Sequence, residues 1–230
     1  MLDNFDFGVI ASSWRYLFLE GMVFTISLTV IAAILGLLLG TAIALIRLAN
    51  IPVLSTAARL FVNLMRALPL VLVIFWFYLS APFVVQWITG SPRPVLLDSF
   101  TLSVITFSLF EAAYFAEIMR AGIESVSKGQ RSAASALGLT YRQSMNNIIL
   151  PQAFRNMLPV MLLQTIVLFQ DTSLVYVLSL TDFLGAASKI AQRDGRFVEM
   201  YLLAAVVYFA ICFAASRGVG LIQNKIRVLR

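Results

Sequence analysis

Histidine is absent from this 230-residue sequence, and cysteine occurs once, as Cys212. Without histidine the chain cannot form a Ser-His-Asp triad or a zinc site of the HExxH kind. A single cysteine excludes an intramolecular disulfide framework. The sequence also lacks a GxxxxGK[ST] motif, so we expect no loop that binds nucleotide phosphates and no cofactor in this chain. These absences favour a protein without catalytic chemistry of its own.

Charged residues are scarce as well, at 12% of the sequence, whereas 60% of the residues are hydrophobic. Soluble domains carry about 25% charged residues, so the composition predicts an integral membrane protein. The net charge of +6 is not gathered into a block of like charges, which argues against nucleic acid as a partner. Asp3 and Asp6 stand where a secretory signal would carry basic residues, so we expect no cleaved signal peptide.

Five apolar segments approach or exceed the roughly 20 residues that a helix needs to cross a bilayer. Acidic residues interrupt two of them: Glu111 and Glu117 lie in the third segment, and Asp171 lies in the fourth. We therefore predict an all-α integral membrane protein with one transmembrane domain over residues 1–230. The predicted spans cover about residues 21–46, 60–85, 99–119, 156–180 and 200–216.

Basic residues next to the spans predict the orientation, because they stay on the cytoplasmic side. Five spans place the two termini on opposite sides of the membrane. With the N-terminus outside, twelve of the 17 basic residues face the cytoplasm, and most acidic loop residues lie outside. We therefore predict an external N-terminus and a cytoplasmic C-terminus. The twelve are Arg47, Arg59, Arg66, Arg120, Lys128, Arg131, Arg142, Arg155, Arg217, Lys225, Arg227 and Arg230.

The segment between the third and fourth spans, about residues 124–152, has an ordered helical pattern. Lys128–Leu139 has small apolar residues at helical spacing, and Gly138 suits the left-handed position that ends a helix. Thr140 can cap a second short helix over Tyr141–Ile149, and Pro151 should end or bend it. One interpretation is an amphipathic linker on the lipid headgroups. The mainly alanine face argues against it, since interfacial helices carry bulky apolar residues.

The same segment resembles the EAA loop of ABC importer membrane subunits. The residues that match are Ala133 and Ala134, Gly138, then Ile148, Leu150 and Pro151. In that family the loop docks as a coupling helix into a cytoplasmic ATPase. This chain departs from the pattern at its first letter, because Ser132 stands where the family usually has glutamate. The difference concerns one polar contact with the ATPase.

Five stretches in order resemble the permeases of polar amino-acid ABC importers, and the details resemble the glutamate/aspartate type. The resemblance implies a bacterial inner-membrane permease that works with a dimer of ATP-binding subunits, a second permease subunit (the same chain or a sister) and an external amino-acid-binding protein. The stretches are "GMVFTISLTVIAAILGLLLGTAIALIRL", "FVNLMRALPLVLVIFWFYLSAP", "AYFAEIMRAGIESVSKGQ", "LPQAFRNMLP" and "DTSLVYVLSLTDFL".

Ionisable residues within spans indicate where a transport path could lie, because an ionised group at the bilayer centre costs about 2.5–3.5 kcal/mol. Glu111 could line the path or hold helices together through a hydrogen bond. We expect its partner to be Gln164, Thr165 or Arg66. Glu117 fits an i,i+3 pair with Arg120, and Glu124 an i,i+4 pair with Lys128. The polar run Gln170, Asp171, Thr172 and Ser173 breaks the fourth span, and the resemblance places it near the translocation path.

Glycine and proline suggest where the spans pack and bend. Gly36 and Gly40 form a GxxxG pair, which permits a close helix contact. Pro69 and Pro159 predict kinks in the second and fourth spans.

Two other functions remain open from the residues alone. An ion-coupled secondary transporter or channel could use Glu111 and Asp171, but five spans do not divide into two inverted repeats. An intramembrane enzyme would need a base beside Ser173, and the sequence offers none.

Overall fold

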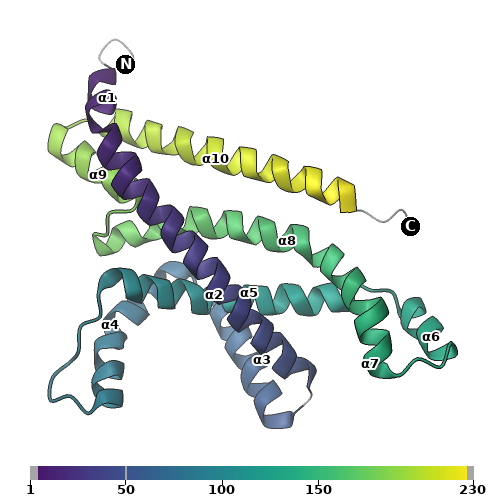
Figure 1. The fold of residues 1–230 in the computed structure, drawn as a ribbon. Helices are drawn as coiled ribbons and strands as arrows, with labels where there is room; N and C mark the ends of the chain where they lie inside the picture. The colour runs from purple at the N-terminus through teal and green to yellow at the C-terminus, as the bar shows by residue number, and fades with distance from the viewer. Residues whose placement is uncertain (1–4, 50, 227–230) are drawn as a thin grey trace.

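The computed structural model describes residues 5–49 and 51–226, and every regular element in those residues is helical (Figure 1). Three short stretches differ from α-helix: η2 and η3 are π-helical and η4 is a 3₁₀ helix. The elements are α1 Phe7–Arg15, η2 Tyr16–Met22, α2 Val23–Leu48, α3 Pro52–Ala67, α4 Leu70–Thr89, α5 Ser99–Glu124, α6 Lys128–Ala136, α7 Tyr141–Ser144, η3 Met145–Ile149, α8 Leu150–Asp171, η4 Thr172–Leu178, α9 Phe183–Asp194 and α10 Phe197–Ile226.

Five helical stretches in the described residues are long and apolar enough to cross a membrane. The first starts at Phe7, well before the predicted start at Gly21, because α1, η2 and α2 follow one another without a break. The last also extends past its predicted range. The five stretches are Phe7–Leu48, Leu70–Thr89, Ser99–Glu124, Tyr141–Leu178 and Phe197–Ile226.

Helix α5 is the centre of the packing, and α2 crosses directly against it. An added Cβ at Gly36 would lie 2.7 Å from Glu111 Cβ, and one at Gly40 would lie 2.8 Å from Phe115 Cβ. The two glycines therefore let the backbones of α2 and α5 approach more closely than any side chain would permit. The GxxxG pair does form the close helix contact that the sequence suggested.

The second predicted span, residues 60–85 with a kink at Pro69, is divided into two separate helices. Helix α3 ends at Ala67 and α4 starts at Leu70, with Leu68 in an extended conformation between them. Proline at position 69 has no N–H to donate and disfavours helical geometry at the preceding residue. Pro69 therefore separates two helices instead of kinking one. Pro159, by contrast, lies inside α8.

The segment after α5 forms a helix–turn–helix as expected. Its second helix, however, does not end at Pro151 as predicted. Helix α6 stops at Ala136 and Gly138 takes φ +73°, which suits a residue without a side chain. Thr140 and Gln143 cap α7 reciprocally: the Gln143 N–H donates to Thr140 Oγ1, and the Thr140 N–H donates to Gln143 Oε1. Pro151 does not end the second helix, because α7, η3 and α8 follow one another without a break and Pro151 lies in the first turn of α8, directly after the π-helical η3.

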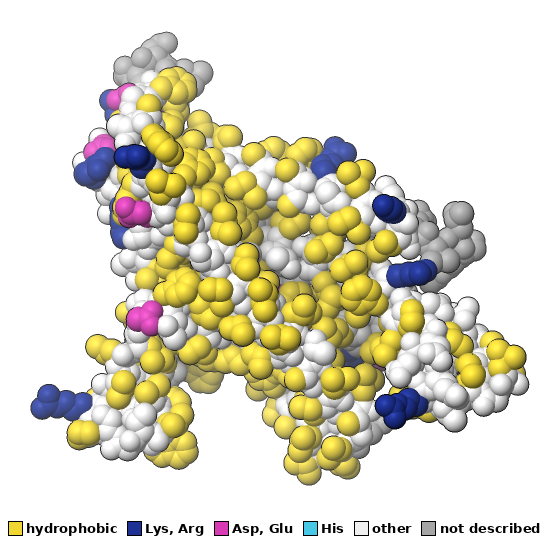
Figure 2. Space-filling model, in the orientation of Figure 1, with side chains coloured by type: hydrophobic (Ala, Val, Ile, Leu, Met, Phe, Trp, Pro, Cys, Tyr) yellow, Lys and Arg dark blue, Asp and Glu magenta, His cyan; other side chains and the backbone are white. Residues whose placement is uncertain are grey.

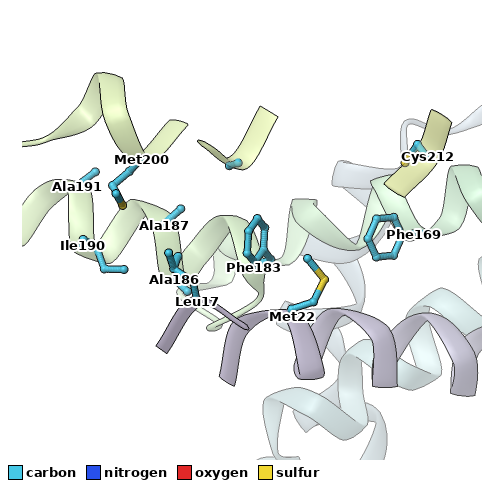
Figure 3. Packing of buried hydrophobic residues seen from close by; sticks show 11 residues of the cluster. Leu17, Met22, Phe169, Phe183, Ala186, Ala187, Ile190, Ala191, Met200 and Cys212 are labelled. Atoms are coloured by element: carbon cyan, nitrogen blue, oxygen red, sulfur yellow. The ribbon is translucent and has the colours of Figure 1, made fainter. Parts of the chain in front are cut away.

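Helix α9, which the sequence analysis did not predict, completes a core at the end of the molecule that carries α1. Leu17 and Met22 of η2 face Phe183 and Ile190 of α9, and α8 and α10 add further apolar side chains (Figure 3). The Asp182 carboxylate caps α9 by accepting N–H bonds from Leu184 and Gly185, each 3.0 Å long. Burial raises the pKa of Asp182 to about 6.

The surface has the distribution expected of a membrane protein. On the face shown in Figure 2, hydrophobic side chains cover the broad middle of the molecule, and charged side chains lie toward its two ends. The acidic side chains visible there lie toward the end with α1 and α9. The end with α6 shows basic side chains only.

Candidate translocation and coupling sites

Glu111 lies in the middle of α5 with its side chain fully enclosed. Gln164 Nε2 of α8 donates a hydrogen bond of 3.1 Å to Glu111 Oε1, so one of the three expected partners is present. The other carboxyl oxygen has no hydrogen-bond partner in the described residues. Arg66, also expected here, pairs elsewhere. In this structure Glu111 joins α5 to α8 next to the close contact with Gly36.

The polar run from Gln170 to Ser173 marks a change of helix type. Helix α8 ends at Asp171, and the 3₁₀ helix η4 starts at Thr172. Thr172 is buried and its hydroxyl donates to the Phe169 carbonyl over 2.7 Å. Gln170 is exposed, and Asp171 and Ser173 are half-buried. The run therefore lies at a helix transition, as its polarity suggested, and its role in a path stays a prediction.

Glu117 lies between three arginines that belong to three different helices. Arg47 of α2 donates to Glu117 Oε2 over 2.9 Å, and Arg66 Nη1 of α3 lies 3.7 Å from Oε1. Arg120 of α5 also donates to Oε1, as the i,i+3 spacing predicted. The Arg66 guanidinium also lies over the Tyr114 ring, 5.7 Å from its centroid. The carboxylate thus holds α2, α3 and α5 together.

The expected pair between Glu124 and Lys128 is not formed. Glu124 accepts a hydrogen bond from Arg120 instead, because α5 ends at Glu124 and Lys128 starts a new helix. Sequence reasoning missed the cluster of Arg47 and Arg66 around Glu117, since these residues lie far from it in the chain. The available signal was that Arg47 directly follows the first predicted span and Arg66 lies near the start of the second, on the same predicted side of the membrane.

The predicted coupling residues lie on one helix–turn–helix, with most of them exposed. Ala134 is buried and holds the inner side of α6, and Ile148 is half-buried in η3. Leu137 and Tyr141 flank the turn and are 77% and 73% exposed, although both are large and apolar. Sequence reasoning missed these two. The exposed members of the predicted set are Ser132, Ala133, Gly138, Leu150 and Pro151.

One hydrogen bond fastens this helix–turn–helix to α5, and a second joins α5 to α8 beside it. Arg131 Nη2 of α6 donates to the Ile123 carbonyl in the last turn of α5 over 3.0 Å. Asn156 Nδ2 of α8 donates to Ser125 Oγ over 2.8 Å. The base of α6 is therefore connected to the last turn of α5, and that end of α5 to α8. An apolar cluster lies beneath the same contacts and consists of Ile123, Val126, Ile149 and Ala153.

No group of three or more Cys, Asp or Glu side chains suited to a metal ion occurs in the part of the chain that the structure describes. A cavity of about 330 Å³ lies beside Glu117, and another of about 410 Å³ lies between α5 and α8. Arg66 borders the second cavity, together with Asn156 and Gly122. The described residues thus offer two cavities, a cluster of paired charges and a turn with exposed apolar side chains.

These features are those of a multi-pass transport subunit, and the comparisons with known proteins agree. Residues 36–228 match the family described as "Binding-protein-dependent transport system inner membrane component". The chain belongs to this family and is an inner-membrane permease component of such an importer.

Individual relatives match over almost the whole chain. The glutamate/aspartate import permease protein GltK of Escherichia coli O6:H1 is 50% identical over 224 residues, covering 96% of this chain and 98% of the relative. The arginine transport system permease protein ArtQ of Bacillus subtilis is 31% identical and covers 97% and 98% of the two chains.

Solved structures agree with this fold. The crystal structure of an amino acid ABC transporter with histidines matches with a TM-score of 0.86 and 30% identity, covering 96% of this chain and 98% of that one. The methionine ABC transporter MetNI, in an inward-facing conformation, matches with a TM-score of 0.66 and 18% identity over 90% of this chain and 96% of that one. The latter likeness concerns the fold alone.

Proposed function

We propose that this chain is the permease subunit of an ATP-driven importer for an acidic amino acid, glutamate or aspartate. The observation that carries the proposal is its 50% identity, over 96% of its length, to a glutamate/aspartate import permease protein. Family membership argues against an ion-coupled secondary transporter built on Glu111 and Asp171. Glu111 has a hydrogen-bonded partner in Gln164, which supports a structural contribution from this carboxyl.

A separate ATP-binding subunit dimer would supply the energy. The exposed turn around Gly138 supports this part of the proposal, because Leu137 and Tyr141 present apolar surface where a membrane protein would otherwise carry polar residues. These side chains suit a cleft on a protein partner. The fastening of Arg131 to the Ile123 carbonyl would then pass movement of the ATPase to α5. Ser132 is exposed on α6, so the departure from the usual glutamate concerns one polar contact at the surface that would meet the ATPase.

The proposed orientation places α6 and the C-terminal end of α10 in the cytoplasm. These two lie on the same side of the molecule, opposite α1 and α9 (Figure 1). The basic side chains at the α6 end agree with the preference of positive charge for the cytoplasm. An external amino-acid-binding protein would then meet the end that carries α1 and α9.

The substrate would pass close to the break between α3 and α4. Arg66 lies one residue before Ala67 at the end of α3, and the first N–H groups of α4 follow Pro69. In discontinuous membrane helices, such free N-terminal groups attract anionic parts of a substrate. Arg66 is 40% exposed and adds a guanidinium at the same place. A second permease subunit, either another copy or a sister chain, would complete the path.

The test is copurification followed by transport. The chain is expressed together with the proposed ATP-binding subunit and binding protein, and Leu137→Gln in this chain should lose the ATPase on affinity purification. Leu96→Gln is the matched control, because Leu96 is 83% exposed and lies in the loop before α5, away from the turn. Proteoliposomes of the intact complex should accumulate labelled glutamate or aspartate only with ATP. Uptake driven by an ion gradient without ATP would refute the proposal.

A further inference from the structure

The cavity beside Glu117 has the size and the donors of a small-molecule site. Its volume of about 330 Å³ lies at the lower end of the range for ligand pockets, about 300–1,000 Å³. Three helices supply its walls: α2, α3 and α5. The polar side chains that line it are Arg47, Arg59, Asn63, Glu117, Arg120 and Glu124.

The charges around this cavity are not balanced by pairing within the chain. Arg120 bonds both Glu117 and Glu124, and Arg47 bonds Glu117 through one nitrogen. Arg59 has no carboxylate partner in the described residues and donates only to oxygens of its own helix. Three guanidinium groups and two carboxylates thus line the cavity, which is an excess of one positive charge, and Arg66 approaches Glu117 from outside the lining.

Arg47, Arg59 and Asn63 retain N–H donors that could serve a ligand. The Arg47 side chain is 13% exposed, and its hydrogen bond to Glu117 uses one nitrogen of a group that has five N–H donors. Asn63 lies one turn after Arg59 on α3, so the two side chains share one wall. A carboxylate between Arg59 and Asn63 would find planar N–H donors from one wall and Arg47 from another.

We propose that this cavity binds a free acidic amino acid from the side of the membrane that carries α6. A zwitterion with a second carboxylate matches the site in sign: its carboxylates face Arg47, Arg59 and Asn63, and its ammonium group faces Glu124. Its net charge of −1 equals the excess positive charge of the lining. The inference rests on the proposed function, because that function gives α6 a cytoplasmic location and the amino acid its identity.

Occupancy would restrain transport. A ligand bound between α2, α3 and α5 would hold α3 against the other two helices, and α3 directly precedes the break at Pro69. The cavity would therefore act as a site of inhibition by imported product. The ligand would bind more tightly to the conformation in which α2, α3 and α5 are close together than to one in which they separate. It would therefore increase the population of the first conformation and slow the transport cycle.

The experiment uses the whole importer in proteoliposomes, with the binding protein and labelled glutamate outside and ATP inside. Unlabelled L-glutamate or L-glutamine is loaded inside. Internal glutamate should slow uptake, and glutamine should do so more weakly because it lacks the second carboxylate. Arg59→Gln should raise the inhibitory concentration of internal glutamate about tenfold or more, and Asn63→Leu by a smaller factor. Arg93→Gln, an exposed arginine in the loop before α5, should leave that concentration unchanged.

Two results would overturn the proposal. One is that internal glutamate inhibits Arg59→Gln and the parent protein at the same concentration. The other is that internal glutamine or inorganic phosphate inhibits uptake as strongly as internal glutamate does. Inhibition that appears only in vesicles containing phosphatidylglycerol would assign the cavity to lipid phosphate instead. Failure of uptake in vesicles without internal glutamate would count against the proposed function and not against the cavity. In that case, the cavity is tested separately by measuring whether labelled glutamate binds to the detergent-purified importer in the absence of the binding protein. Binding lost in Arg59→Gln supports the site, and absence of binding refutes it.

Discussion

Arg47 of α2 donates a hydrogen bond of 2.9 Å to Glu117 of α5, and this contact joins two positions that are 70 residues apart in the chain. Both side chains are largely buried, at 13% and 18% exposure. Because Arg66 and Arg120 approach the same carboxylate, Glu117 compensates more positive charge than any other acidic residue in the described part of the chain. This carboxylate therefore fixes how α2, α3 and α5 meet.

Glu117→Gln should lower the stability of the chain by roughly 1–3 kcal/mol, because the neutral amide leaves partly buried guanidinium groups without their counter-charge. Thermal unfolding in detergent measures the effect. Cys212 is the single cysteine and is buried, so its reaction with a thiol-reactive dye reports unfolding. Glu124→Gln is the control, since its side chain is 62% exposed and pairs with Arg120 alone. If both variants lowered the unfolding temperature by the same amount, Glu117 would not contribute more to the packing of the three helices than Glu124 does.

Gly40→Ala should destabilise the contact between α2 and α5 by about 1–3 kcal/mol, since the new Cβ would lie 2.8 Å from Phe115 Cβ and 2.9 Å from the Ala112 carbonyl oxygen. Gly36→Ala should have a comparable effect through its approach to Glu111. The same unfolding measurement applies. Gly218→Ala in α10 is the matched control, because nothing lies within 4 Å of its added Cβ. That variant should be neutral or slightly stabilising, as alanine favours a helix over glycine. Tolerance of Gly40→Ala would mean that α2 and α5 can separate at little cost.

Gly138→Ala should cost about 1 kcal/mol, because a side chain disfavours its φ of +73°. Gly90→Ala should cost a similar amount, since Gly90 has φ +65° and also lies in open space. Only the Gly138 variant should reduce ATP-dependent uptake, because only that residue lies in the turn proposed to meet the ATPase. The ratio of amino-acid uptake to ATP hydrolysis in proteoliposomes distinguishes the two variants: it should fall in Gly138→Ala and stay unchanged in Gly90→Ala. A loss of this ratio in Gly90→Ala as well would assign the effect to general destabilisation.

The stability of the chain should depend on pH through Asp182. Burial raises the pKa of this carboxyl from 3.8 to about 6 in the folded chain. Between about pH 4 and pH 6 the folded state therefore retains a proton that the unfolded state has lost. Stability should fall as the pH rises through this window, by roughly 2–3 kcal/mol, and should not change further above it.

Asp182→Asn should abolish this slope while keeping the cap of α9, since asparagine also accepts hydrogen bonds at a helix N-terminus. Asp182→Ala should abolish the slope and lose about 1 kcal/mol at every pH, because the N–H groups of Leu184 and Gly185 lose their acceptor. Thermal unfolding from pH 4 to pH 8 compares the three proteins. If the stability of Asp182→Asn still falls between pH 4 and pH 6, another group causes the pH dependence.

The sequence by itself determined the membrane class, five apolar stretches and the turn at Gly138 and Thr140. Each of these depends on composition or on residues close together in the chain, such as a capping threonine and a glycine at a helix end. The same local reasoning failed at Pro69, where a long apolar run concealed a break between α3 and α4. Hydropathy measures how well a segment suits lipid, but it does not register a missing N–H.

The tertiary structure alone decided which charges meet. Arg47, Arg66 and Glu117 come together because Gly36 and Gly40 bring α2 onto α5, and α3 follows from the end of α2. The cavity lined by Arg59 and Asn63 arises from the same arrangement. No periodicity in the sequence encodes such contacts, because they depend on the packing of three helices and on the cost of leaving a buried charge without a partner.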